Sequence, residues 1–362
     1  MHKFFTSSFD ASIYLQQPNQ NSGRDEILEV GKLYYGATKD IHRTLIKFDT
    51  GSIKSDIVSI GSGSWKAYLN LRAANSEEIP LEYTIYANAV SQSWTMGTGT
   101  KFDNISTDGV SWYYKDGQRD WMAGTAGFYN SYMSGSIESN GTGSIEQGGG
   151  GTWYTASQAS QSFNYEIDDV RMDVTEIVKL WNSGSIPNNG FIVHHSRQAE
   201  KDDTDYGILK FFSKETHTIY EPKLELVWND SVFVTGSLSS IPEENFKIAY
   251  TNLKSKYQKN SKIKIRVKGR ELYPLRTFSG TFDYDNSNYL PTSSYYQLED
   301  YVTGEVVYPF GDYTKISCDA SGSYFIMNLH TLPINRTYTL KTKIIQSDIE
   351  YIIDDKTTFE IV

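Results

Sequence analysis

The chain has 362 residues, with 34 basic and 44 acidic side chains and a formal net charge of −10 at pH 7. This length predicts two or three domains, each large enough to bury a core without disulfide bonds. The single cysteine, Cys318, excludes an intrachain disulfide framework. The net negative charge argues against nucleic acid or anionic lipid as a partner. No apolar window of about 18 residues is present, so we expect no membrane insertion. The start lacks a signal-peptide pattern, so we expect synthesis in the cytoplasm.

Most regular segments alternate apolar and polar residues, which is the pattern of strands with one buried face. Clusters of glycine, asparagine, aspartate and serine separate these segments, as turns require. In chain order the predicted strands are 43–49, 65–72, 81–87, 207–212, 223–228, 262–267 and 338–345.

Helix signals are scarce, and the clearest is the segment 173–181. Asp173 is placed to cap its N-terminus, and Glu176 occupies the capping-box position three residues later. Gly184 then offers a C-terminal stop. One short helix among many strands predicts an all-β protein.

The segment 97–155 interrupts the strand pattern. Residues 97–152 hold 13 of the 28 glycines and many interleaved aromatic residues. One interpretation is a surface insertion that packs its aromatic side chains on the sheet or on a neighbouring subunit. The other is a loop that binds a ligand or partner, because long loops often carry function. The candidate partner-binding or glycan-binding residues are Trp112, Tyr113, Trp121, Tyr129, Trp153 and Tyr154.

A domain boundary is predicted near residue 232, where Trp228–Ser231 closes the last strand of the first half. Residues 233–362 carry 15 basic and 15 acidic side chains, so the other 19 basic and 29 acidic side chains leave the whole charge of −10 on residues 1–232. Such different charge balances favour two modules, 1–232 and 233–362.

Familiar catalytic motifs are absent from the sequence. Cys318 follows a strand-like segment and is predicted to be a buried thiol. His194 and His195 follow Phe191–Val193, so strand geometry predicts one ring near the core and one exposed.

The acidic group Asp202, Asp203 and Asp205 is the best candidate for a metal site, in which alternating carboxylates would meet on calcium. The alternative is a solvated turn, because the spacing lacks the glycine and downstream glutamate of an EF-hand. No other cofactor is expected.

Five basic residues share one parity of a predicted strand, namely Lys262, Lys264, Arg266, Lys268 and Arg270. They are interpreted either as the solvated face of an outer strand, where lysines prevent edge pairing, or as a docking stripe for an acidic neighbour.

A series of short motifs follows in order over residues 8–229. They are Asp10-Ala11, Pro18-Asn19, Asn21–Gly23, Val30-Gly31, 43–49, 67–71, Ser93-Trp94, 110–112, 173–175 with Trp181 and Gly184, 189–192, Phe211 with Ser213–Glu215, and 222–224. This order resembles DNRLRE-type domains, with an enlarged glycine and aromatic region. The resemblance implies a jelly-roll-like β-sandwich of the carbohydrate-binding-module type, found on extracellular proteins and virion components.

The second module carries a looser set of motifs, in Arg270–Pro274, Leu290–Tyr296, Asp300 with Thr303–Glu305, and Lys315–Asp319. These are similar to β-sandwich modules in structural proteins of contractile-tailed marine bacteriophages. The resemblance implies a second, Ig-like β-sandwich and assembly in a virion.

Together these observations predict two β-sandwich modules that form a non-enzymatic virion structural protein of the tail, baseplate, neck or head. Other virion subunits would be its partners, and the chain would form an oligomer in the assembled particle. The alternative is a carbohydrate-binding adhesion module that recognises a glycan on the host surface.

Overall fold

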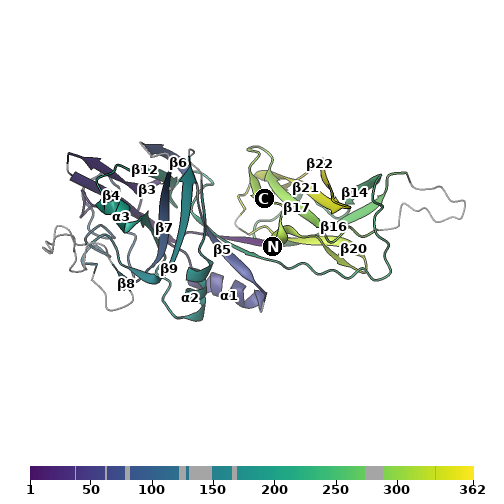
Figure 1. The fold of residues 1–362 in the computed structure, drawn as a ribbon, viewed down its shortest axis with the longest axis horizontal. Helices are drawn as coiled ribbons and strands as arrows, with labels where there is room; N and C mark the ends of the chain where they lie inside the picture. Colours follow the sequence, from purple (N-terminus) through teal and green to yellow (C-terminus); the bar gives the residue numbers. More distant parts are fainter. Residues whose placement is uncertain are drawn as a thin grey trace, which may run out of the picture. The chain divides into compact units, whose positions relative to one another are not determined.

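The computed structural model describes the chain except for residues 37, 62, 78–81, 122–127, 130–148, 165–168, 274–287 and 331, and gives only the backbone of residues 50, 76, 77, 128, 129, 156 and 164. Figure 1 shows the elements along the chain. The first part contains β1 (His2–Thr6), β2 (Phe9–Tyr14), β3 (Ile27–Tyr35), β4 (Thr38–Lys47), α1 (Thr50–Ile60), β5 (Trp65–Leu71), β6 (Ala73–Glu77), β7 (Glu82–Val90), β8 (Phe128–Tyr129), β9 (Trp153–Asn164), β10 (Val170–Asp173), α2 (Thr175–Ser183), β11 (Phe191–His195), α3 (Arg197–Lys201), β12 (Gly207–Phe212) and β13 (Lys223–Trp228). The second contains β14 (Phe246–Tyr250), β15 (Lys256–Tyr257), β16 (Lys262–Glu271), β17 (Ser294–Asp300), β18 (Val306–Tyr308), η3 (Asp312–Thr314), β19 (Ser317–Asp319), β20 (Gly322–Asn328), β21 (Arg336–Gln346) and β22 (Ile349–Ile361).

The described residues form four sheets. A nine-stranded sheet runs in the order β6-β12-β3-β4-β11-β7-β9-β8, with β2 also paired to β4, and a four-stranded sheet runs β1-β13-β5-β10. The later strands form a four-stranded sheet, β14-β16-β20-β19, and a five-stranded sheet, β15-β22-β21-β17-β18. This confirms the predicted all-β class with a β-sandwich-like architecture.

The chain divides into two compact units. We call Phe5–Gly61 with Lys66–Glu225 the N-terminal unit, and Met1–Phe4 and Ser62–Trp65 with Leu226–Val362 the C-terminal unit. The predicted boundary at residue 232 differs from this division because the chain changes unit within β13. The first four residues also belong to the C-terminal unit, since β1 pairs with β13.

Every predicted strand corresponds to an observed one, because alternation reports directly on which face is buried. In β5 and β12 the observed bounds lie within one residue of the predicted ones. Several strands extend further than predicted: β16 continues to Glu271 and β7 to Val90, while β4 begins at Thr38 and β21 at Arg336.

The predicted helix is α2, but its N-cap is Val174 rather than Asp173. Asp173 lies one residue earlier, and its Oδ1 still accepts a hydrogen bond from the Thr175 amide at 3.1 Å. Gly184 ends the helix with φ 76°, a left-handed conformation that glycine adopts readily.

The expectation of one helix was wrong, because α1 and α3 are present as well. Asp49, assigned above to a strand end, is the N-cap of α1 and accepts from the Ser52 amide at 3.1 Å. Ile53 and Ile57, four residues apart, are the buried side of this otherwise exposed helix. Among the described residues, we find no helix with the length and apolar character to cross a bilayer.

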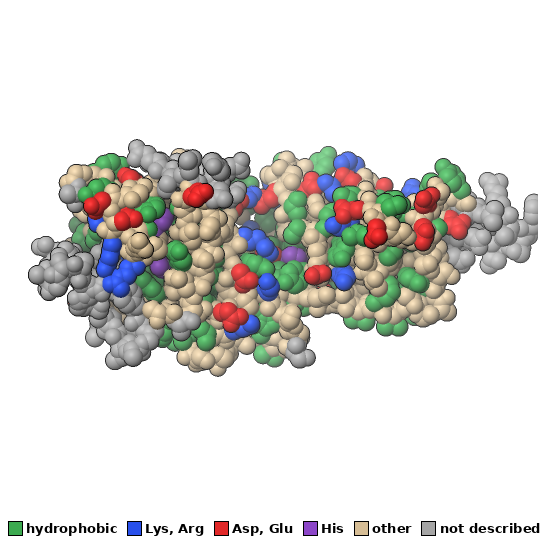
Figure 2. All heavy atoms as spheres, viewed as in Figure 1, with side chains coloured by type: hydrophobic (Ala, Val, Ile, Leu, Met, Phe, Trp, Pro, Cys, Tyr) green, Lys and Arg blue, Asp and Glu red, His purple; other side chains and the backbone are tan. Residues whose placement is uncertain are grey.

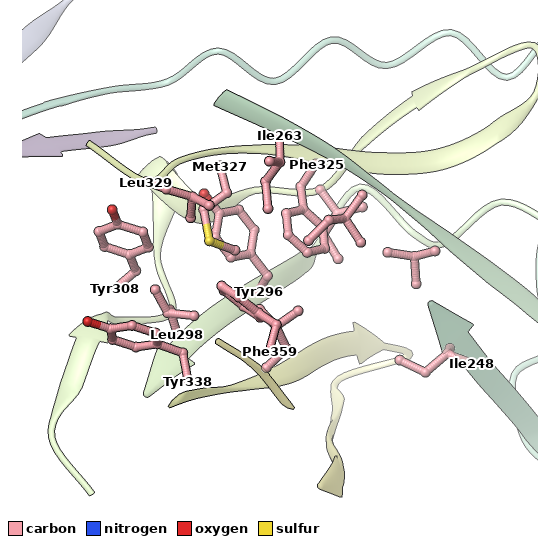
Figure 3. Packing of buried hydrophobic residues seen from close by; sticks show 14 of the residues in the cluster. Ile248, Ile263, Tyr296, Leu298, Tyr308, Phe325, Met327, Leu329, Tyr338 and Phe359 are labelled. Atoms are coloured by element: carbon pink, nitrogen blue, oxygen red, sulfur yellow. The ribbon is translucent and has the colours of Figure 1, made fainter. Parts of the chain in front are cut away.

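The core of the C-terminal unit lies between its two sheets. Figure 3 shows aromatic side chains from both sheets pointing toward one another, with Tyr296 of β17 close to Phe325 of β20. Their rings stack with centroids 4.2 Å apart. Cys318 of β19 is buried as predicted, and burial raises the pKa of its thiol.

Candidate functional site

The predicted contact residues of the long segment are mostly interior. Trp112 and Trp121 are fully buried, and Trp153 is 5% exposed, all in a core cluster with Ile13, Leu45 and other residues of the N-terminal unit. Their rings therefore have no surface to offer a partner or a sugar. Packing on the sheet, the first of the two interpretations of this segment, describes these three tryptophans.

The other candidates differ from the tryptophans in their surroundings. Tyr113 and Tyr154 are half-buried. The backbone of Tyr129 pairs with Trp153 in the β8–β9 ladder, whereas its side chain lies outside the described residues, as does most of 122–148.

Arg43 lies between two of these tryptophans. Its guanidinium carbon is 4.9 Å from the Trp112 ring centroid and 5.2 Å from that of Trp153. Glu200 of α3 accepts from Arg43 Nε at 2.9 Å and from Nη2 at 2.6 Å, and both residues are buried. The pair and its aromatic walls thus fasten α3 onto the sheet from within.

The glycines of this segment let its backbone approach the same arginine. Gly149, Gly150 and Gly151 all have φ between 81° and 95°. The Gly150 carbonyl accepts from Arg43 Nη1 at 2.5 Å, and a Cβ on Gly150 would lie 2.5 Å from that nitrogen. The glycine run therefore serves close packing here.

The three candidate calcium ligands have separate protein partners. Asp202 Oδ1 lies 2.7 Å from Nζ of the buried Lys32, and Asp203 Oδ1 lies 3.1 Å from Lys39 Nζ. Asp205 accepts from the Gly207 amide at 2.8 Å. Within the described part of the chain no group of three or more acidic, histidine or cysteine side chains is arranged to hold a metal. The arrangement is a lysine-linked turn.

The prediction of one exposed and one buried histidine was wrong. His194 and His195 are 3% and 1% exposed, because β11 lies between β4 and β7 inside the large sheet and both of its faces are covered. His194 Nε2 is 3.1 Å from Asn88 Oδ1. Burial lowers the pKa of each histidine to about 4.

We expect His195→Phe to weaken the loss of stability on acidification. A histidine with a folded pKa of about 4 binds a proton less readily than in the unfolded chain, so stability is lost as pH falls below about 6.5. Urea unfolding at pH 7 and pH 5 measures this for both proteins. The variant retains the contribution of His194. An equal loss in the variant and the natural protein would contradict the assignment.

Within the described residues of the long segment, many side chains between 98 and 108 are exposed, and we call residues 96–110 the 96–110 loop. Buried Asn21 organises it: Nδ2 donates to the Met96 and Val110 carbonyls, both at 2.7 Å, and Oδ1 accepts from the Gly99 amide at 2.8 Å. Asp108 joins the two sides of the loop by accepting from Thr98 Oγ1 at 2.6 Å. The loop is therefore held in shape from its base.

The tip of the 96–110 loop exposes two large apolar side chains. Phe102 is 87% exposed and Ile105 is 63% exposed, and Asp103 between them is also exposed. Sequence reasoning missed both residues because it favoured tryptophan and tyrosine. The sequence did offer a signal: Phe102 and Ile105 are isolated apolar residues in a polar stretch that has neither the strand nor the helix period.

Acidic groups lie beside this loop. Burial raises the pKa of Asp25 to about 6, and the negative charges of Glu29 and Asp103 act in the same direction, against the hydrogen bond from the Lys101 amide. Lys101 Nζ is 2.6 Å from Glu29 Oε2 and so is already paired. The tip is consequently apolar with an acidic border.

On the C-terminal unit, the predicted basic stripe is real but its strand is central, because β16 lies between β14 and β20. The edge-guarding explanation therefore does not apply. Lys247 of β14 pairs in register with Arg270, and Tyr324 and Ile326 of β20 pair with Arg266 and Lys264. We call this surface the basic face, comprising Lys247, Lys262, Lys264, Arg266, Lys268, Arg270, Tyr324 and Ile326.

Part of the basic face is neutralised locally. Asp319 accepts from Arg266 at 2.6 and 2.8 Å, and lies 3.0 Å from Lys264 Nζ. The hydrogen bonds from Arg266 hold the pKa of Asp319 well below its ordinary value. Lys264 Nζ also lies 3.7 Å from the Tyr324 ring centroid.

The five-stranded sheet of the same unit carries mixed charges instead. Lys341 pairs with Glu299 at 2.5 Å, and Lys343 pairs with Glu350 at 3.4 Å. In the view of Figure 2, acidic, basic and hydrophobic side chains are interspersed over the C-terminal unit.

Comparisons with known proteins leave the family open. No family model matches the chain, and no curated protein matches it. Among solved structures, a DUF4785 family protein from Legionella pneumophila aligns with a TM-score of 0.18 and 10% sequence identity, covering 99% of this chain and 61% of that one. A similarity this low supports no argument about fold or function. At 61% coverage, the chain spans less than two thirds of that protein. The resemblances to DNRLRE-type domains and phage modules stay predictions.

Proposed function

We propose that the chain is a non-enzymatic structural subunit of a bacteriophage virion that acts through protein–protein contacts. The observation that carries this proposal is the 96–110 loop, whose shape is fixed by Asn21 while Phe102 and Ile105 project from its tip. A preorganised apolar tip binds without first ordering its own backbone, and large apolar side chains dominate interface energies. The sandwich-like architecture, the motif order that resembles DNRLRE-type domains, and the similarity of the second module to phage structural modules support the same proposal.

The test is incorporation into particles made in cells that express this chain. Mass spectrometry of purified particles is expected to find it at a fixed copy number, and Phe102→Ser/Ile105→Ser is expected to lower that number at least about tenfold. Val58→Ser is the matched control, because Val58 is 75% exposed on α1 of the same unit. Absence of the natural chain from particles would reject the proposal. Normal incorporation of the double variant would reject the loop as the contact.

Glycan recognition by the N-terminal unit is the alternative proposal. Among the predicted candidates whose side chains the structure describes, Tyr113 and Tyr154 are half-buried and keep some accessible surface. A glycan array with the natural chain and a Tyr113→Ala variant tests this alternative. Binding that the variant loses would favour it, and no binding to any surface polysaccharide would reject it.

A further inference from the structure

The basic face holds more cations than the acidic side chains that pair with it among the described residues. Within the described part of the chain, Lys247, Lys262 and Lys268 form no ion pair, whereas Asp319 serves Lys264 and Arg266. Lys247 and Arg270 are directly opposite one another on adjacent strands, and like charges in that position are destabilising. An acidic group supplied from outside would pair with Lys247, Lys262 and Lys268.

The chain's net negative charge lies in residues 1–232, and the 96–110 loop exposes two of the acidic side chains there. Residues 233–362 sum to zero charge, and the whole of the −10 lies on residues 1–232. In the N-terminal unit the 96–110 loop combines exposed Phe102 and Ile105 with Asp103 and Asp108, which are also exposed. The basic face offers the counterpart, since its cations surround the half-buried Tyr324 and Ile326.

We propose that the 96–110 loop of one copy docks on the basic face of a second copy. This inference rests on the proposed function, because it names a second copy of the chain as the partner that the 96–110 loop contacts during assembly. Phe102 and Ile105 would cover Tyr324 and Ile326, while Asp103 would approach Lys268 and its neighbours. Each copy carries both surfaces, so the contact joins two different surfaces and can continue from copy to copy. Charge complementarity makes the association sensitive to salt.

Sedimentation velocity of the full chain tests the inference. The natural protein is expected to self-associate with rising concentration at an ionic strength of about 0.1 M and to dissociate at about 1 M. Lys268→Glu and Asp103→Lys are each expected to weaken association at least about tenfold. Lys54→Glu, an exposed lysine of α1 with the same charge change, is the control and is expected to behave as the natural protein.

A mixture of the two variants provides the decisive measurement. In the mixture the reversed face of Lys268→Glu meets the reversed loop of Asp103→Lys, and the two unaltered surfaces also meet, so association is expected to return. Phe102→Ser keeps the test independent of loop folding, because its exposed ring contributes little to stability, and it is also expected to weaken association.

Several results would overturn the inference. A natural protein that stays monomeric at low salt would do so, even if particle analysis upholds the virion role. Association that Lys268→Glu abolishes but Asp103→Lys and Phe102→Ser leave intact would assign another occupant to the basic face. Binding of a single-stranded DNA oligonucleotide that Lys268→Glu abolishes, without self-association of the natural protein, would assign a polyanion instead.

Discussion

Glu200→Gln is expected to lower the free energy of unfolding by about 3–5 kcal/mol. Glu200 and Arg43 are both buried, and the carboxylate receives two hydrogen bonds from the guanidinium. Removing its charge leaves Arg43 as an uncompensated cation inside the protein, where water cannot solvate it. The loss is much larger than the value of an exposed pair, because desolvation dominates the cost.

Urea unfolding of the natural chain and two variants measures this effect. Glu176→Gln is the matched control, since Glu176 pairs with Lys179 on the exposed surface of α2 and is expected to change stability by no more than about 0.5 kcal/mol. Arg43→Met/Glu200→Leu replaces both charges by apolar groups and is expected to recover much of the loss. Equal effects of Glu200→Gln and Glu176→Gln would contradict the buried placement of Arg43.

Trp112→Ala is expected to cost about 3–5 kcal/mol of unfolding free energy. The ring is fully buried in the core of the N-terminal unit and forms one wall of the Arg43 site. The substitution therefore creates a cavity and also exposes the arginine to an incompletely packed environment. The stability loss follows from packing and has no relation to a binding surface.

Phe102→Ala separates the two roles that an aromatic residue of this segment can have. Because the Phe102 ring is 87% exposed, its removal is expected to change stability by less than about 0.5 kcal/mol. Thermal unfolding of both variants by circular dichroism measures the difference. If the Trp112→Ala protein were as stable as the natural chain, the burial of Trp112 in the core would be contradicted, and Trp112 would again be a candidate for surface contact.

The sequence predicted the strands well because alternation depends only on which face of a strand is buried. It missed α1 because Asp49 follows an alternating segment without a break, so its capping role with Ser52 depends on where β4 ends. It also placed β16 at an edge, although its two faces were assigned correctly. Edge or central position depends on pairing between distant strands, which alternation does not encode.

The candidate site was harder to predict than the fold. Aromatic residues serve equally in cores and at interfaces, and composition does not distinguish the buried Trp112 from the exposed Phe102. The buried state of both His194 and His195 required knowing that the large sheet is covered on both faces. The lysines that form ion pairs with Asp202 and Asp203 come from β3 and β4, far away in sequence.

Asn21 fixes the shape of the 96–110 loop without contributing to its exposed tip. Its amide holds the base of the 96–110 loop through Met96, Gly99 and Val110, whereas Phe102 and Ile105 project beyond that base. Substitutions at the tip therefore leave the frame of the loop intact. A change at Asn21 removes three anchoring hydrogen bonds together, so the loop tolerates sequence change at its tip far better than at its base.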